Sequence, residues 1–258
     1  MITANRSIGT MSLSKLLCVV FIPTSILTIV YVIVGFMQDT IPSLLLFFLC
    51  ATFILFPIEI GIIMYASKEE YGRCSLESSF SRHSEMSWWR ILLYGSILFA
   101  FSGIVSVTIA PLENNLFAPI SDRLAQITPA YFDWSNIEYM KQYPKGILLL
   151  TCVGYFVLNV IVGPIVEELF FRGYLTAKIS RFGDLAPLII TILFSLYHFW
   201  LPFNNLFRIA VFLPAAWVAW KKNNIYISIV FHCLCNPSSA PLRIQVLSFR
   251  GLAFRAGW

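Results

Sequence analysis

The sequence predicts an all-α fold, a polytopic bundle of about seven transmembrane helices (roughly six to eight) that forms one membrane domain over residues 1–258. Of the 258 residues, 58% are hydrophobic and only 12% are charged, which leaves too little polar surface to cover a soluble globule. The mean hydropathy of +0.77 agrees with this. The net charge of +5 is modest and spread over the loops, so the composition indicates a lipid bilayer as partner and excludes nucleic-acid binding.

The first predicted helix follows Lys15. About 22 mostly apolar residues come after this lysine without a small-x-small cleavage pattern, which is too long for the apolar core of a signal peptide and favours a retained membrane helix over residues 16–37. Further apolar segments predict helices at 43–66, 91–110, 147–180, 185–201, 206–220 and 223–238.

The lysines and arginines of the loops predict an orientation. With the N-terminus on the cytoplasmic side, ten of them lie inside and seven outside, as the positive-inside rule requires. The expected location of this multi-pass protein is a bacterial plasma membrane, with the N-terminus in the cytoplasm. The outer loop 111–146 contains Pro111, Pro119, Pro129 and Pro144 and is expected to lie at the interface without a stable fold. Residues 238–258 form a short basic tail.

Three charged residues interrupt the fourth apolar segment. Glu167, Glu168 and Arg172 lie among Ile, Leu, Val and Phe, where each would cost several kcal/mol if left bare in lipid. The spacing of four places Glu168 and Arg172 on one helical face, so they can form an ion pair. Glu167 points about 100° away from Glu168 and is free to face another partner.

The membrane segments contain few other strongly polar side chains, among them Glu59, His198, His232 and Asn236. His232 and Asn236 are four residues apart and share one face of a helix. Counted from the inner end of its own helix, Glu167 lies about 11 residues deep, His198 about 14 and His232 about 10, or roughly 17, 21 and 15 Å. We therefore expect these three side chains to meet near the middle of the bilayer.

Glu59 lies at nearly the same depth as Arg172, about 10 Å against about 9 Å from the inner ends of their helices. Equal depths suggest an interhelical ion pair that supports the site. The alternative is that Glu59 faces a wet cavity alone.

These residue types indicate a hydrolytic site. A carboxylate beside a histidine can take a proton from water, and a second histidine with an amide can donate hydrogen bonds to the oxyanion that forms when water attacks a peptide carbonyl. The sequence contains neither Gly-x-Ser-x-Gly nor His-Glu-x-x-His, so no other hydrolase motif competes with this interpretation.

Three short motifs carry a family resemblance. They are Glu167-Glu168-x-x-x-Arg172, Phe194-x-x-x-His198 and His232-x-x-x-Asn236, in this order on successive predicted helices. Over about residues 147–237 they resemble the motifs of the CPBP family of intramembrane glutamic proteases. That family includes the Ras-converting CAAX endopeptidases and bacterial relatives linked to bacteriocin processing or immunity.

The resemblance implies a role for each motif residue. Glu167 would be the base that activates water and His198 would orient that water. His232 and Asn236 would form the oxyanion hole, and Glu168 and Arg172 would support the site. One departure from the family is that residues 208–220 contain Pro214 and no glycine, whereas family members often carry small residues before the third motif.

The predicted function is an intramembrane endopeptidase that uses no metal or other cofactor and acts on a peptide or protein substrate, which the CAAX resemblance would allow to be lipidated. Two alternatives stay open. Glu167, His198 and His232 would also make a chemically sensible zinc triad for a metalloprotease. The polar residues could instead serve a non-catalytic immunity protein or a proton-coupled transporter.

Overall fold

The computed structural model describes residues 10–238, and their regular structure is helical, with no strand in this range. The chain begins with α1 (Leu13–Met37) and continues through α2 (Ser43–Cys50), a π-helical turn and α3 (Phe56–Tyr71), which together form one helical segment. The predicted tail lies outside the described residues except for Ser238.

Four helical segments are long and apolar enough to cross a membrane: Leu13–Met37, Ser43–Tyr71, Trp88–Ile127 and Lys145–Lys178. Three shorter helices follow them, α9 (Ala186–Leu196), α10 (Asn205–Lys222) and α11 (Tyr226–Ser238). Each expected apolar segment therefore contains a helix, and the all-α membrane fold class is confirmed.

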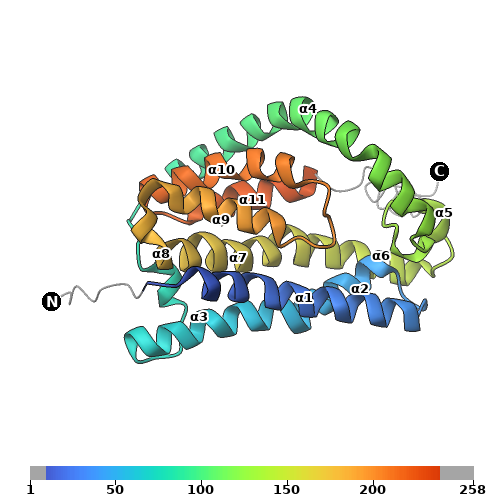
Figure 1. Ribbon diagram of the computed structural model, residues 1–258, viewed down its shortest axis with the longest axis horizontal. Coiled ribbons are helices and arrows are strands. Elements are labelled where there is room, and N and C mark those ends of the chain that lie inside the picture. Colours follow the sequence, from blue (N-terminus) through green and yellow to red (C-terminus); the bar gives the residue numbers. More distant parts are fainter. Residues whose placement is uncertain (1–9, 239–258) are drawn as a thin grey trace, which may run out of the picture.

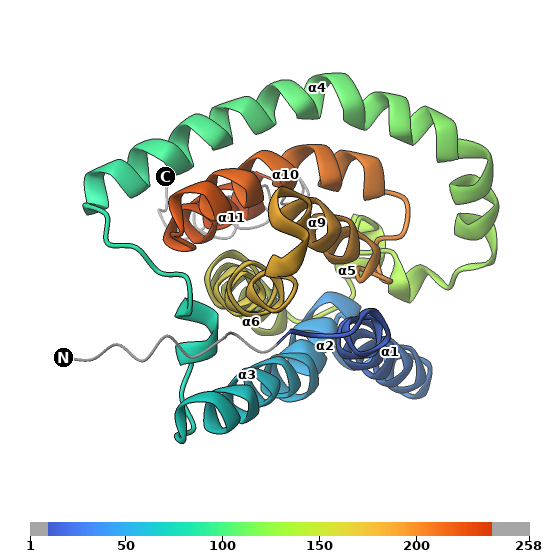
Figure 2. The same cartoon turned by 60° about the vertical axis from the view of Figure 1, so that its left-hand side comes forward.

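The third segment differs from its predicted bounds. Helix α4 (Trp88–Ile127) runs for 40 residues and passes through Pro111 and Pro119, so the prediction that the helix ends at residue 110 is wrong. A proline removes one hydrogen bond and bends a helix without having to end it. Figure 2 shows α4 as one long arch over α10 and α11, and both of these helices pack against it.

The chain between α4 and residue 145 also has a defined structure, contrary to the expected irregular loop. A 3₁₀ turn at Ala130–Phe132 and α5 (Ile137–Met140) follow α4. Trp134 Nε1 donates a hydrogen bond of 3.0 Å to the hydroxyl of Tyr31 on α1, and the ring of Phe132 lies 5.5 Å from that of Tyr31 in an edge-on contact. Aromatic packing on α1 thus fixes this connection.

The segment Lys145–Lys178 runs between two groups of helices, with α1–α3 on one side and α9–α11 on the other (Figure 1). It comprises α6 (Lys145–Gly154), α7 (Gly163–Glu167) and α8 (Thr176–Lys178), joined by π-helical turns at Tyr155–Val162 and Glu168–Leu175. Such wide turns recur at functional sites because they change the direction of the side chains that follow.

Gly173 lies where the loop before α4 touches this segment. A Cβ atom here would be 2.6 Å from the carbonyl oxygen of Ser79, closer than any side chain tolerates. The glycine thus allows the turn Glu77–Phe80 to pack directly against the segment that contains Arg172.

Asp184 links the turn before α9 to the end of α10 by hydrogen bonds. Its carboxylate accepts hydrogen bonds from Lys221 Nζ at 2.6 Å and from Trp220 Nε1 at 3.1 Å. These bonds, that of Lys221 foremost, lower the pKa of Asp184, so the contact persists to a lower pH than an unpaired carboxylate would allow.

Glu113 on α4 caps the N-terminus of α10. Its two carboxylate oxygens accept hydrogen bonds from the backbone N–H groups of Leu206, at 2.9 Å, and Phe207, at 2.7 Å. Glu113 is buried, and the negative charge also suits the positive end of the helix dipole. The arch of α4 is therefore joined to the helix that precedes the third sequence motif.

Replacement of Glu113 by Ala is expected to lower the free energy of unfolding by about 1–2 kcal/mol, because two backbone N–H groups of the first turn of α10 lose their acceptor. Thermal unfolding in detergent micelles measures the loss. Glu113→Gln keeps one oxygen acceptor and should lose less, whereas the exposed Glu138→Gln should lose nothing. An unchanged unfolding temperature for Glu113→Ala would show that the cap contributes no stability.

Candidate active site

Glu168 contacts both a histidine and an arginine of the site. It is fully buried, and its Oε1 accepts a hydrogen bond of 2.9 Å from His232 Nδ1 on α11. Arg172 Nη1 lies 3.1 Å from the same oxygen, and the guanidinium group also stands 4.0 Å over the ring of Phe194. The i,i+4 ion pair expected from the sequence is present, and it also holds a histidine from another helix.

Glu167 points in a different direction from Glu168, as the 100° rotation between adjacent helical residues requires. Its Oε1 accepts a hydrogen bond from the hydroxyl of Tyr197. Its Oε2 lies 3.6 Å from His232 Nε2. The two oxygens of one carboxylate thus face two different partners, and 12% of the side chain is accessible.

His232 stands between the two glutamates. Because Nδ1 faces the carboxylate of Glu168, the hydrogen bond assigns a proton to Nδ1 and leaves Nε2 directed at Glu167. The ring also makes edge-on contacts with Phe212, at 4.6 Å between centroids, and Phe194, at 5.8 Å. The histidine is therefore fixed in orientation by one carboxylate and presented to the other.

His198 lies outside the helix in which it was expected. The prediction extended this helix to residue 201, but α9 ends at Leu196. His198 Nδ1 is 2.7 Å from the carbonyl oxygen of Phe194, which fixes that nitrogen as a donor. The ring packs against Tyr197, at 4.4 Å between centroids. Within residues 10–238 no hydrogen bond or ion pair joins His198 to Glu167.

Asn236 lies one turn after His232 on α11, and its backbone carbonyl accepts a hydrogen bond of 2.8 Å from the hydroxyl of Tyr155. Its side-chain Nδ2 donates a hydrogen bond of 2.6 Å to the carbonyl oxygen of Asn159. That carbonyl belongs to the π-helical turn Tyr155–Val162, where the backbone hydrogen bonds depart from the regular α-helical pattern. The turn thus fixes the amide of Asn236 to the segment that carries Glu167.

Glu59 does not pair with Arg172. No ion pair within 4.0 Å joins the two side chains in the described part of the chain, and Arg172 binds Glu168 instead. The guanidinium faces Phe194 and Phe212 on α9 and α10, whereas Glu59 is buried on α3 at the other side of the segment. The prediction of an interhelical pair is therefore wrong.

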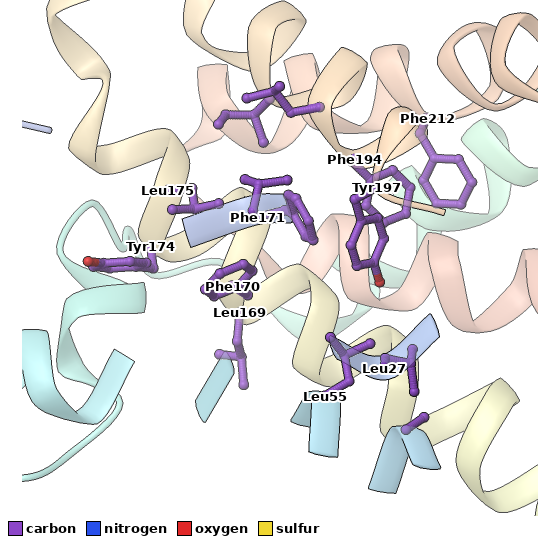
Figure 3. Close-up of a cluster of buried hydrophobic side chains, with 14 of the residues drawn as sticks. Leu27, Leu55, Leu169, Phe170, Phe171, Tyr174, Leu175, Phe194, Tyr197 and Phe212 are labelled. Atoms are coloured by element: carbon purple, nitrogen blue, oxygen red, sulfur yellow. The ribbon is translucent and has the colours of Figure 1, made fainter. Parts of the chain in front are cut away.

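Tyr197 is the contact that the sequence interpretation missed. It directly precedes His198 and is fully buried, at the edge of the aromatic cluster that includes Phe171, Phe194 and Phe212 (Figure 3). A tyrosine hydroxyl within an apolar segment requires a hydrogen-bond partner, and this requirement could have drawn attention to it. Its partner lies 30 residues away in the sequence.

A zinc triad is the alternative use of Glu167, His198 and His232. Within residues 10–238 no group of three or more His, Cys, Asp or Glu side chains is placed to hold a metal ion. The contacts instead form a line from Arg172 through Glu168 and His232 to Glu167, in which each charged group has a polar neighbour. Such a line can fix a carboxylate beside an imidazole and move a proton at the carboxylate.

The comparison with protein families finds a match in the second half of the chain. The model of the family described as Rce1-like, Type II CAAX prenyl endopeptidase Rce1-like, matches residues 149–238. No curated protein and no solved structure shows significant similarity to the chain. The matched region contains all three motifs, so the resemblance drawn from the sequence is confirmed, and the N-terminal helices lie outside it.

Proposed function

Residues 149–238 match the family of Type II CAAX prenyl endopeptidases, and from that premise we propose that the chain hydrolyses a peptide bond within the membrane with Glu167 as the base. The observation that supports this proposal is the setting of Glu167. Its carboxylate lies within a membrane segment, accepts a hydrogen bond from the Tyr197 hydroxyl and faces His232. Within residues 10–238 no lysine or arginine forms an ion pair with this carboxylate, and such a group in a membrane segment suits proton transfer better than structural support.

In the proposed reaction Glu167 takes a proton from a water molecule as the water oxygen bonds to the scissile carbonyl carbon. The carbonyl oxygen becomes an oxyanion. When the C–N bond breaks, the proton moves from Glu167 to the departing nitrogen, so that the carboxylate is restored. His198 would orient the water. The contact between its Nδ1 and the Phe194 carbonyl supports this role, because it holds the ring in place and leaves Nε2 for the water.

The oxyanion would be stabilised by His232, through a protonated Nε2, and by Asn236, through the second N–H of its amide; both residues lie on one face of α11. Both are held by groups of the segment 145–178, His232 by Glu168 and Asn236 by the carbonyl of Asn159. Donors that are already oriented need no rearrangement as charge develops, which is how such a site lowers the barrier. Glu168 and Arg172 would act by fixing His232.

The proposed substrate is a peptide or protein that reaches the site from the bilayer, and a lipid attached near its C-terminus would suit the apolar surroundings. We further propose that residues 1–258 form one membrane domain with a cytoplasmic N-terminus, in a bacterial plasma membrane. The four long apolar helices establish an integral membrane protein. The excess of Lys and Arg in the loops 67–90 and 178–184 supports the proposed orientation.

Metal removal tests the choice between the glutamic and the zinc mechanism. The protein, reconstituted in liposomes, would be offered prenylated and unprenylated C-terminal peptides and bacterial leader peptides, with the Glu167→Gln protein as blank. We expect cleavage to persist at an undiminished rate after treatment with a strong chelator, measured by mass spectrometry of the products. Loss of cleavage with recovery on added Zn²⁺ would establish the metalloprotease instead. An absence of cleavage for every peptide class would favour the immunity or transport alternative.

A further inference from the structure

Tyr197 links the proposed base to the part of the chain that the family match does not cover. Building on the proposed function, we propose that Tyr197 is a positioning residue, which holds the carboxylate of Glu167 in its reactive orientation, and that Thr24 on α1 holds Tyr197. The juxtaposition is a chain of two hydrogen bonds from α1, through the residue after α9, to the segment that contains Glu167.

The first step is the bond to the carboxylate. The Tyr197 hydroxyl donates to Oε1 of Glu167, and Oε2 faces His232. A glutamate side chain has three rotatable bonds, so without a fixed donor its carboxylate would sample several orientations. The hydroxyl therefore distinguishes the two oxygens and leaves Oε2 as the one that takes the proton from water.

The second step is the rigidity of the tyrosine ring. The ring centroid of Tyr197 lies 4.8 Å from that of Phe171 and 5.7 Å from that of Phe194, and none of the residue is accessible. A ring packed in this way cannot turn without opening the core. The same ring contacts His198 at 4.4 Å, so the proposed base and the residue that would orient its water share one rigid neighbour.

The third step is the bond from α1. Thr24 is fully buried and its Oγ1 donates a hydrogen bond of 2.6 Å to the backbone carbonyl oxygen of Tyr197. This carbonyl lies just beyond the last residue of α9 and also accepts a hydrogen bond of 2.9 Å from the backbone N–H of Phe199, so Thr24 and the turn after α9 hold it together. A stacked contact at 5.8 Å between Phe21 on α1 and Phe199 reinforces the attachment. Helix α1 thus fixes where the chain leaves α9, and with it the position of the Tyr197 hydroxyl.

The test begins with Tyr197→Phe, which removes only the hydroxyl. We expect kcat for peptide cleavage to fall roughly 10- to 100-fold, the usual effect of losing a hydrogen bond to a charged group, with KM nearly unchanged because the hydroxyl bonds the base and not the substrate. The matched control is Tyr174→Phe, which removes the hydroxyl of another buried tyrosine of the same hydrophobic core and should leave both constants unchanged. A wild-type kcat for Tyr197→Phe would overturn the proposal, as would a change confined to KM.

Thr24→Val tests the attachment to α1. We expect kcat to fall about 3- to 10-fold, since the loss of one neutral hydrogen bond moves Tyr197 without removing its hydroxyl. The control is Thr191→Val, another fully buried threonine, whose hydroxyl donates a hydrogen bond to the carbonyl of Pro187 in its own helix. Because Thr24 acts through Tyr197, the double variant should be no slower than Tyr197→Phe alone. Independent, multiplying losses would overturn the link between them.

The Glu167→Gln protein separates failure of this inference from failure of the proposed function. If Glu167→Gln still cleaves peptide, the assignment of the base is wrong and the role of Tyr197 falls with it. If Glu167→Gln is inactive and Tyr197→Phe keeps the wild-type kcat, the base stands and the positioning role alone is refuted. Circular dichroism and thermal unfolding of each variant establish that a lost rate belongs to folded protein.

Discussion

Glu167→Gln is expected to lower kcat for peptide cleavage by roughly 10²- to 10⁴-fold, the range over which a positioned general base contributes to a rate. Glutamine has nearly the same shape and can still accept the hydrogen bond from Tyr197 through its amide oxygen. Because the shape and the hydrogen bond are kept, the variant should fold, insert into the membrane and unfold thermally as the wild type does. Because the amide cannot take a proton from water, single-turnover cleavage of a peptide in liposomes should be nearly lost.

Glu167→Asp gives a graded comparison. Aspartate retains the carboxylate but is one methylene shorter, so it withdraws the oxygens from Tyr197 and His232, and we expect an activity between those of the wild type and Glu167→Gln. The exposed Glu138→Gln should have no effect. Full activity in Glu167→Gln would refute the catalytic assignment, and equal activities of the Gln and Asp variants would mean that basicity is not what the site supplies.

The sequence predicted the fold class and the pairing of charges because both depend on short-range rules. Apolar length identifies membrane helices whatever their packing. A spacing of four places Glu168 and Arg172 on one face of an α-helix, and the two side chains still pair in the π-helical turn that they occupy. The end of α4 was placed too early because residues 111–146 were assigned to a loop, whereas α4 packs on α10 and α11 and continues past Pro111 and Pro119.

The wrong prediction for Glu59 arises because depth in the membrane was used in place of the direction in which each side chain points. Glu59 and Arg172 were expected to pair because their depths match, but depth does not determine which way a side chain faces around its helix. The π-helical turn that begins at Glu168 shifts the direction of the residues after it, and Arg172 faces Phe194 on α9. Tyr197 was missed because its contact with Glu167 depends on how two helices pack.

The second large effect concerns Arg172, whose replacement by Met is expected to lower the free energy of unfolding by about 3–5 kcal/mol. Methionine approximates the length of the arginine stem and can pack against Phe194, but it leaves the buried carboxylate of Glu168 without its cation, which is the costly way to break a buried pair. Thermal unfolding in detergent micelles measures the loss. Cleavage should weaken as well, since Glu168 fixes His232.

The double variant Glu168→Gln/Arg172→Met decides whether the unpaired charge causes this loss. Both charges are removed, while the amide oxygen at position 168 can still accept the hydrogen bond from His232 Nδ1. Replacing a complete buried pair by neutral groups is often close to neutral in stability, so we expect the double variant to recover most of the unfolding temperature that Arg172→Met loses. If the double variant is as unstable as the single one, the loss comes from the packing of the guanidinium on Phe194 and Phe212 and not from the charge left on Glu168. If Arg172→Met unfolds at the wild-type temperature, the ion pair adds no stability, and its remaining role is to hold Glu168 in the orientation that fixes His232.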